Sequence, residues 1–267
     1  DTTVNHAPKR KEILTHAEKV LAIKNALRYF PEHLHEELAA EFADAYIPLD
    51  ELFAEALKTQ PEPLYYSADG VHPNANGAEF IQISTDYVFD GTAHVPYKET
   101  EPTCPNSVYG STKLAGERNA LTRCSRAMII RTAWLYSTFG NNFVKTMIGL
   151  GKERESLGVI FDQVGTPTYA RDLASAIFVA IRQGVEPGIY HFSNEGVCSW
   201  YDFTKAIHRL AGITACRVNP LHTEEYPTPA KRPHYSVLDK TKIKNTYHIE
   251  IPYWMDSLQS CIAELEA

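Results

Sequence analysis

From residue 80 onward, short apolar runs alternate with segments whose apolar residues recur at helical spacing. The run FIQIS at 80–84 is rich in β-branched and aromatic residues and has the length of a strand. The segment AMIIRTAWLY from 127 predicts a second buried strand followed by polar and aromatic residues, and NNFVKTMIGLGKE at 141–153 predicts an amphipathic helix. Alternating strands and helices favour a parallel sheet with both faces covered. The sequence therefore predicts an α/β fold.

The polar residues at 85–87 directly follow the first predicted strand, at the end where α/β sheets bind ligands. The segment NSVYGSTKLAGERNALTR predicts a helix that begins at Asn106 or Ser107. Within it, Tyr109 and Lys113 lie on one face. An ammonium group favours the ionised form of a neighbouring phenol, and such a tyrosine can exchange a proton with a substrate oxygen. The pair points to carbonyl reduction, and the alternative is an exposed tyrosine and lysine on a solvated helix face.

Several longer segments carry a resemblance to a known family, beginning at about Ala78. In chain order they are GAEFIQISTDYVFDG, PNSVYGSTKLAGE, IIRTAWLYSTFGNNFVKTM, DQVGTPTYARDLASAI, GIYHFSNEG and RPHYSVLD. From there to the C-terminus the chain resembles the dTDP-4-dehydrorhamnose reductases, which are extended short-chain dehydrogenase/reductases. The resemblance implies an incomplete Rossmann-like parallel sheet, a dTDP-sugar substrate, and NADPH or NADH as cofactor.

Carried over residue by residue, the resemblance implies that Thr85, Tyr109 and Lys113 are catalytic. Tyr109 would give a proton to the substrate carbonyl, while Lys113 would lower the pKa of Tyr109 and hold the nicotinamide ribose, so both would also bind the cofactor. Thr85 would position the reacting oxygen, and Thr85, Asp86 and Trp134 would contact the deoxysugar. Taken singly, Thr85 is an ordinary strand-end residue, Asp86 a turn former and Trp134 a core residue.

The first 79 residues lack the glycine-rich turn that a nicotinamide cofactor requires. In Rossmann-like enzymes this turn follows the first strand and lets the pyrophosphate approach the backbone at a helix N-terminus. Residues 1–79 contain only Gly70 and Gly77, and neither follows a predicted strand and opens a helix. We therefore expect little or no reductase activity, and a non-catalytic protein with reductase-like architecture is an alternative.

Two other families resemble parts of this N-terminal region. Residues 4–43 have a helical pattern and are similar to the N-terminal segment of urocanate hydratase. Residues 38–81 resemble the C-terminal end of an SGNH hydrolase, whose Asp-x-x-His pair matches Asp69 and His72. Such a pair activates a serine, and no Gly-Asp-Ser-like segment precedes it, so an esterase is the weaker alternative.

The joins between these segments fall inside shared stretches, LAAEFA and NANGAEFI, and not in linkers. This pattern favours a chimera with a mostly helical N-terminal region. Its expected parts are a helical segment at 1–43, a hydrolase-like segment at 44–79 and a reductase-like α/β region at 80–267.

Charge and composition limit the classes of partner that the chain is expected to bind. The net charge of −7 comes with no basic cluster, which argues against a nucleic-acid partner. No apolar run reaches membrane-spanning length and the N-terminus lacks a signal-peptide core, so we expect a cytoplasmic chain without a membrane partner. The five cysteines have no C-x-x-C spacing and predict reduced thiols, and no metal site is expected. A homo-oligomer is compatible with the resemblance.

Overall fold

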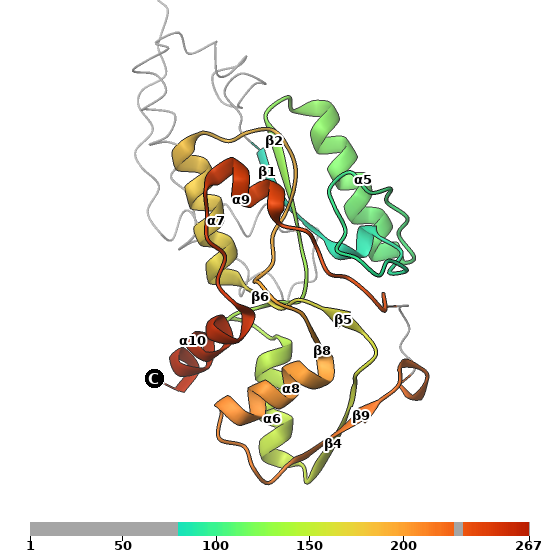
Figure 1. Ribbon diagram of the computed structural model, residues 1–267, viewed down its shortest axis with the longest axis vertical. Coiled ribbons are helices and arrows are strands. Elements are labelled where there is room, and N and C mark those ends of the chain that lie inside the picture. The colour runs from blue at the N-terminus through green and yellow to red at the C-terminus, as the bar shows by residue number, and fades with distance from the viewer. Residues whose placement is uncertain (1–79, 227–231, 267) are drawn as a thin grey trace, which may run out of the picture. The chain divides into compact units, whose positions relative to one another are not determined.

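The computed structural model describes residues 80–226 and 232–266, which belong to one compact unit of the chain, His72–Ala267 (Figure 1). The expectations for the two N-terminal segments, including the pair Asp69 and His72, lie outside the described residues and stay predictions.

A three-stranded parallel sheet forms one half of this unit. Its strands, in spatial order, are β1 (Phe80–Thr85), β2 (Ala127–Thr132) and β7 (Gly188–His191). Helix α5 (Val108–Arg123) lies against one face, while α7 (Ala170–Gln183) and α9 (Thr241–Tyr247) lie against the other (Figure 1). The prediction of an α/β fold with a parallel sheet is confirmed, and β1 and β2 coincide with the two predicted strands.

Alternate residues of the strands face opposite helices, as the pleat of a strand requires. Ile83 and Ile130 are partners in the register and join the apolar cluster formed with α7 and α9. The next pair in the register, Ser84 and Arg131, contacts Glu117 of α5 on the other face. All six residues of β2 are buried, since helices cover both of its faces.

A buried ion pair joins the sheet to α5. The Arg131 Nη2 atom lies 2.7 Å from Oε2 of Glu117, and the Arg131 Nε atom donates to Oε1 at 3.0 Å. The Ser84 hydroxyl donates to the same carboxylate at 2.5 Å. The guanidinium also lies over the ring of Phe89, 5.1 Å from its centroid. One carboxylate therefore fixes the rotation of α5 against β1 and β2.

The other half of the unit packs around a second apolar cluster that includes Phe203 and Leu258. Its larger elements are α6 (Phe143–Glu153), α8 (Trp200–Leu210), α10 (Trp254–Glu266) and the parallel strands β4 (Ser156–Ile160) and β9 (Arg217–Leu221). Short elements complete it: β3 (Leu135–Tyr136) with β6 (Thr168–Tyr169), β5 (Val164–Gly165) with β8 (Cys198–Ser199), and η2 (Thr223–Glu225). The short helix η1 (Asp86–Val88) belongs to the first half, where it directly follows β1. The helix predicted at 141–153 is confirmed as α6.

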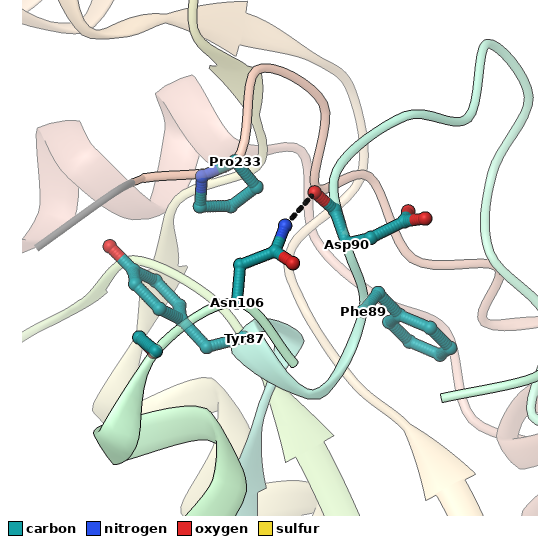
Figure 2. A pocket seen from close by; sticks show the side chains of 6 residues that line it. Tyr87, Phe89, Asp90, Asn106 and Pro233 are labelled. Atoms are coloured by element: carbon teal, nitrogen blue, oxygen red, sulfur yellow. Dashed lines mark hydrogen bonds between the residues drawn. The ribbon is translucent and has the colours of Figure 1, made fainter. Parts of the chain in front are cut away.

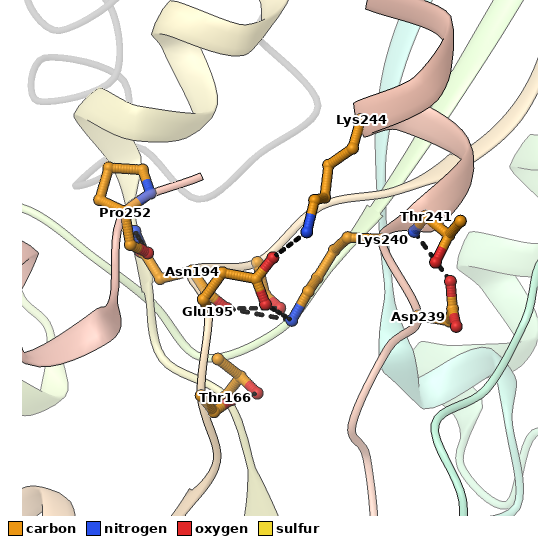
Figure 3. Close-up of polar contacts among 10 residues, drawn as sticks. Thr166, Asn194, Glu195, Asp239, Lys240, Thr241, Lys244 and Pro252 are labelled. Atoms are coloured by element: carbon orange, nitrogen blue, oxygen red, sulfur yellow. Dashed lines mark hydrogen bonds and ion pairs between the residues drawn. The ribbon is translucent and has the colours of Figure 1, made fainter. Parts of the chain in front are cut away.

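A polar network holds the segment after β7 to the start of α9 (Figure 3). Glu195 accepts a hydrogen bond from Lys244 at 2.8 Å and lies 3.3 Å from the ammonium of Lys240. Lys240 also donates to the carbonyl of Asn194, and burial lowers the pKa of Lys240. Because the Lys240 ammonium contacts both the Glu195 carboxylate and the Asn194 carbonyl, we interpret this buried lysine as structural.

No helix in the described part of the chain is long and apolar enough to cross a membrane. All five cysteines fall within the described ranges and none of them forms a disulfide there, as the sequence predicts.

Removing the Glu117 carboxylate tests the buried ion pair. Glu117→Ala leaves Arg131 charged and unpaired among buried groups, which typically costs about 3–5 kcal/mol. Urea denaturation followed by tryptophan fluorescence should show a loss of free energy of unfolding in that range. The control is Arg171→Ala, which removes an exposed ion pair to Glu264 and should cost less than about 1 kcal/mol. Equal losses of free energy of unfolding in the two variants would contradict a stabilising role for the buried pair.

Candidate active site

The chain turns sharply where β1 ends. Thr85 is the last residue of the strand, and its hydroxyl accepts a hydrogen bond from the backbone N–H of Tyr87 at 3.2 Å, which caps η1. The same hydroxyl donates to Oδ1 of Asp86 at 2.9 Å. Both Thr85 and Asp86 are buried. Two of the three residues predicted to contact the sugar therefore lie together at the carboxyl end of the strand.

Asp86 is a buried carboxyl group with an altered proton affinity. Burial raises the pKa of Asp86 to about 6, while the hydrogen bond from the Thr85 hydroxyl and the nearby Ser236 hydroxyl act in the opposite direction. A carboxyl group with this pKa changes its protonation state near neutral pH, so it can either accept or donate a hydrogen bond at a substrate hydroxyl.

Helix α5 begins beside this turn. Ser107 is its N-cap and accepts a hydrogen bond from Gly110 N–H at 3.1 Å, so the helix begins at one of the two predicted residues. The side chain of Asn106 donates to the carbonyl of Asp90 at 2.8 Å and ties the loop after η1 to the helix (Figure 2). A Cβ atom at Gly110 would lie 2.2 Å from the carbonyl oxygen of Tyr87. The first turn of α5 thus needs a glycine to pack against η1.

Tyr109 and Lys113 project from the first two turns of α5 near the end of β1. Tyr109 is 55% exposed, and its ring meets Tyr87 edge-on, with the ring centroids 5.6 Å apart. The Lys113 ammonium donates to the carbonyl of Ile83 at 2.6 Å. Burial lowers the pKa of Lys113, and the carboxylate of Glu117 partly offsets this effect. The structure therefore fixes the lysine head group two residues before Thr85 and leaves the phenol accessible.

Trp134 approaches the same edge of the sheet from β2. Its backbone has a φ of 50°, an unusual value for a tryptophan, and its ring stacks on Trp200 with the centroids 3.5 Å apart. A Cβ atom at Gly165 would lie 2.7 Å from both the Trp134 ring and the Ser236 hydroxyl. Ser236 also acts on Asp86, so Trp134 borders the Asp86 site while it packs in the core between the two halves of the unit.

The structure brings the predicted residues Thr85, Asp86, Tyr109 and Lys113 to one edge of the sheet, with Trp134 beside them. Sequence reasoning missed three supporting residues, which are Glu117, Trp200 and Ser236. A signal existed for one of them, because the charge of Arg131 within an otherwise apolar strand requires a buried partner. The arrangement places the Lys113 ammonium and the buried Asp86 carboxyl group near one solvent-accessible phenol, that of Tyr109, which can donate a proton.

Comparison with known proteins identifies the family of the chain. The family model of the RmlD substrate binding domain matches residues 72–267. The chain belongs to this family. The sequence-based resemblance from about residue 78 onward is therefore confirmed.

Several named proteins are similar to the chain over about seven tenths of its length. The dTDP-4-dehydrorhamnose reductase of Escherichia coli K12 is 43% identical over 201 residues, which cover 72% of this chain and 67% of the relative. The crystal structure of a dTDP-4-dehydrorhamnose reductase from Clostridium acetobutylicum is 47% identical, with a TM-score of 0.69 over 72% of this chain and 68% of that one. The Bacillus anthracis reductase, solved in complex with NADP, is 40% identical, with a TM-score of 0.68 over 72% of this chain and 67% of that one.

The pKa of Asp86 predicts a pH dependence of stability. Its folded-state pKa of about 6 lies above the ordinary value of 3.8, so the protonated form favours folding. This contribution is complete below pH 4 and is lost as the pH rises through 6. At about 1.4 kcal/mol per pKa unit, the free energy of unfolding of the native chain relative to Asp86→Asn should fall by up to roughly 3 kcal/mol between pH 4 and pH 7. Urea denaturation at several pH values measures this difference, and a constant difference would contradict the assignment.

The close approach at Gly110 can be tested with a pair of glycine variants. Gly110→Ala forces the first turn of α5 away from Tyr87, and we expect a loss of about 1–3 kcal/mol in free energy of unfolding despite the higher helix propensity of alanine. The matched control is Gly149→Ala in α6, where an added Cβ meets no atom within 4 Å. This control should gain up to about 1 kcal/mol. The same sign for both variants in thermal unfolding would refute the steric account.

Proposed function

We propose that residues 80–267 supply two parts of the active site of a dTDP-4-dehydrorhamnose reductase. These are the part that binds the sugar nucleotide and the residues that donate the proton. The observation that carries this proposal is the hydrogen bond from Lys113 to the carbonyl of Ile83. It holds the ammonium at the end of β1, close to Thr85 and one helical turn from Tyr109. The names of relatives at 43% and 47% identity support the reaction class.

In this proposal each residue has a defined task. Tyr109 gives its phenolic proton to the carbonyl oxygen of a dTDP-4-keto-6-deoxysugar, and Lys113 lies one helical turn away, with its ammonium held at the end of β1. The Thr85 hydroxyl donates to the same substrate oxygen and sets its position. Asp86 and Trp134 contact the sugar, the carboxyl group through hydroxyl groups and the indole through its apolar face.

The cofactor proposed for the reaction is NADPH, with NADH as the alternative, and the NADP complex of the Bacillus anthracis relative supports this choice. The cofactor would supply the hydride. Among the described residues, Lys113 and Tyr109 fit the ribose side of such a molecule, since one is a fixed ammonium and the other an accessible hydroxyl. Neither residue offers the ring of backbone N–H groups that binds a pyrophosphate.

We further propose that the 267-residue chain by itself has little or no turnover. Its first 79 residues contain only Gly70 and Gly77 and offer no glycine-rich turn after a predicted strand. Hydride transfer needs the two reacting carbons held about 3–3.5 Å apart, and this positioning supplies a large part of the rate enhancement. A single ammonium at Lys113 cannot hold the dinucleotide in that position.

An activity assay separates the two parts of the proposal. The purified chain is mixed with NADPH and dTDP-4-dehydro-6-deoxy-L-mannose, and the absorbance of the reduced cofactor is followed. We expect no saturation by NADPH at millimolar concentration and no measurable oxidation. Oxidation that scales with the chain, disappears in Tyr109→Phe and persists in the control Tyr253→Phe would show instead that the chain is an active reductase.

A binding measurement tests the substrate side independently. Titration with dTDP-rhamnose should change the tryptophan fluorescence, because Trp134 and Trp200 stack beside the proposed sugar site. Asp86→Ala should weaken this binding at least tenfold, whereas Asp256→Ala on α10 should not. Failure of the nucleotide sugar to bind would overturn the proposed substrate side whatever the assay with NADPH shows.

A further inference from the structure

Three side chains of the types that ligate metals lie near the carboxyl ends of β4 and β9, and none of them belongs to the candidate active site. The parallel register pairs Ile160 with Leu221, the last residues of the two strands. Asp162 follows β4 by two residues and His222 follows β9 directly, so both leave the sheet at the same edge. Glu224 lies in η2, one residue further along the chain than Thr223.

Contacts within the fold hold the first two of these side chains. The backbone N–H of Thr223 donates to both carboxylate oxygens of Asp162 at 3.1 Å, and the Thr223 hydroxyl donates to Oδ1 at 2.7 Å. The ring of His222 packs edge-on against Phe161, with the ring centroids 4.8 Å apart. The backbone N–H of His222 donates to Glu225 at 2.7 Å. The position of the carboxylate is therefore set before any ligand arrives, and the imidazole rests against Phe161.

The spacing of the donor atoms suits one shared cation. The Nδ1 atom of His222 lies 3.7 Å from Oδ2 of Asp162, which is too long for a hydrogen bond. Two ligand atoms bonded at about 2.1 Å to one tetrahedral ion are about 3.4 Å apart, close to the observed separation. In the described part of the chain, the donors of Asp162, His222 and Glu224 all lie within 4.8 Å of one another. Small rotations of His222 and Glu224, both exposed side chains, would complete the approach.

We propose that Asp162, His222 and Glu224 form a binding site for a transition-metal dication of the zinc class. One imidazole nitrogen with two carboxylates is a donor set that suits Zn²⁺, whereas Mg²⁺ and Ca²⁺ prefer oxygen ligands alone. Water would complete the coordination. The proposal does not depend on the reductase activity, and it replaces the sequence-based expectation of a chain without a metal site.

The expected consequence is structural, because the ion would join the ends of the two paired strands. A ligand that binds only the folded state stabilises it in proportion to the logarithm of its concentration over its dissociation constant. Zinc should therefore raise the unfolding temperature of the native chain and have a smaller effect on variants of the site.

The site can be tested by titration with zinc. The full chain is treated with EDTA, desalted, and titrated in competition with a chromophoric chelator. The N-terminal region contains other histidines, so the comparison is between variants. Relative to the native chain, His222→Ala should lose one zinc equivalent or bind it at least tenfold more weakly. Glu224→Gln, which keeps the side-chain size, should also weaken binding. The control His94→Ala removes an exposed histidine elsewhere and should bind as the native chain does.

Cobalt(II) provides a second readout that reports coordination. Native chain loaded with cobalt should show the intense visible absorption of a four-coordinate ion, and His222→Ala should lose it. Identical zinc stoichiometry and affinity in His222→Ala and the native chain would overturn the proposal. Equal displacement of zinc by Mg²⁺ at the same concentration would also overturn it, since a site with an imidazole ligand discriminates against magnesium.

Discussion

The buried ion pair between Glu117 and Arg131 is the constraint on which the placement of α5 depends. A charged pair removed from water is stable only when its geometry is good and further hydrogen bonds support it. Here the guanidinium binds the carboxylate through two nitrogens, and the Ser84 hydroxyl donates to the same carboxylate. Any rotation of α5 would break these contacts together. Lys113 lies one turn before Glu117 on the same face, so the rotation that satisfies the ion pair also carries the lysine to the end of β1.

Burial, together with the charge of Arg131, controls the protonation of a histidine on the neighbouring strand. His191 of β7 is fully buried, and burial followed by the charge of Arg131 lowers its pKa to about 3. The histidine is therefore neutral at physiological pH, and its Nδ1 atom contacts the carbonyl of Tyr97 at 3.0 Å. The neutral His191 therefore adds no further charge beside the buried pair of Arg131 on β2 and Glu117 on α5. The polar contacts among Ser84, Arg131 and Glu117 therefore occupy the face of the sheet that α5 covers. The apolar cluster formed with α7 and α9 covers the other face.

Parallel pairing explains why functional side chains gather at two separate places. In both halves of the unit, parallel strands end at the same edge, and the residues that follow them are brought together. The ends of β1 and β2 collect Thr85, Asp86 and Trp134, while the ends of β4 and β9 collect Asp162 and His222. The stack of Trp134 on Trp200 connects the first of these places to the second half of the unit.

The sequence by itself determined the α/β class, the strands β1 and β2, the helices α5 and α6, and the residue types at the candidate site. These features depend on local periodicity, on capping and on the order of short motifs, all of which a linear sequence displays. Tertiary structure alone decided that Lys113 binds the carbonyl of Ile83, that Ser236 meets Asp86 and that Asp162 approaches His222. Each of these contacts joins residues 30 or more positions apart. Such contacts arise from strand register and helix rotation, which are set by the packing of the whole unit and leave no periodic trace in the sequence.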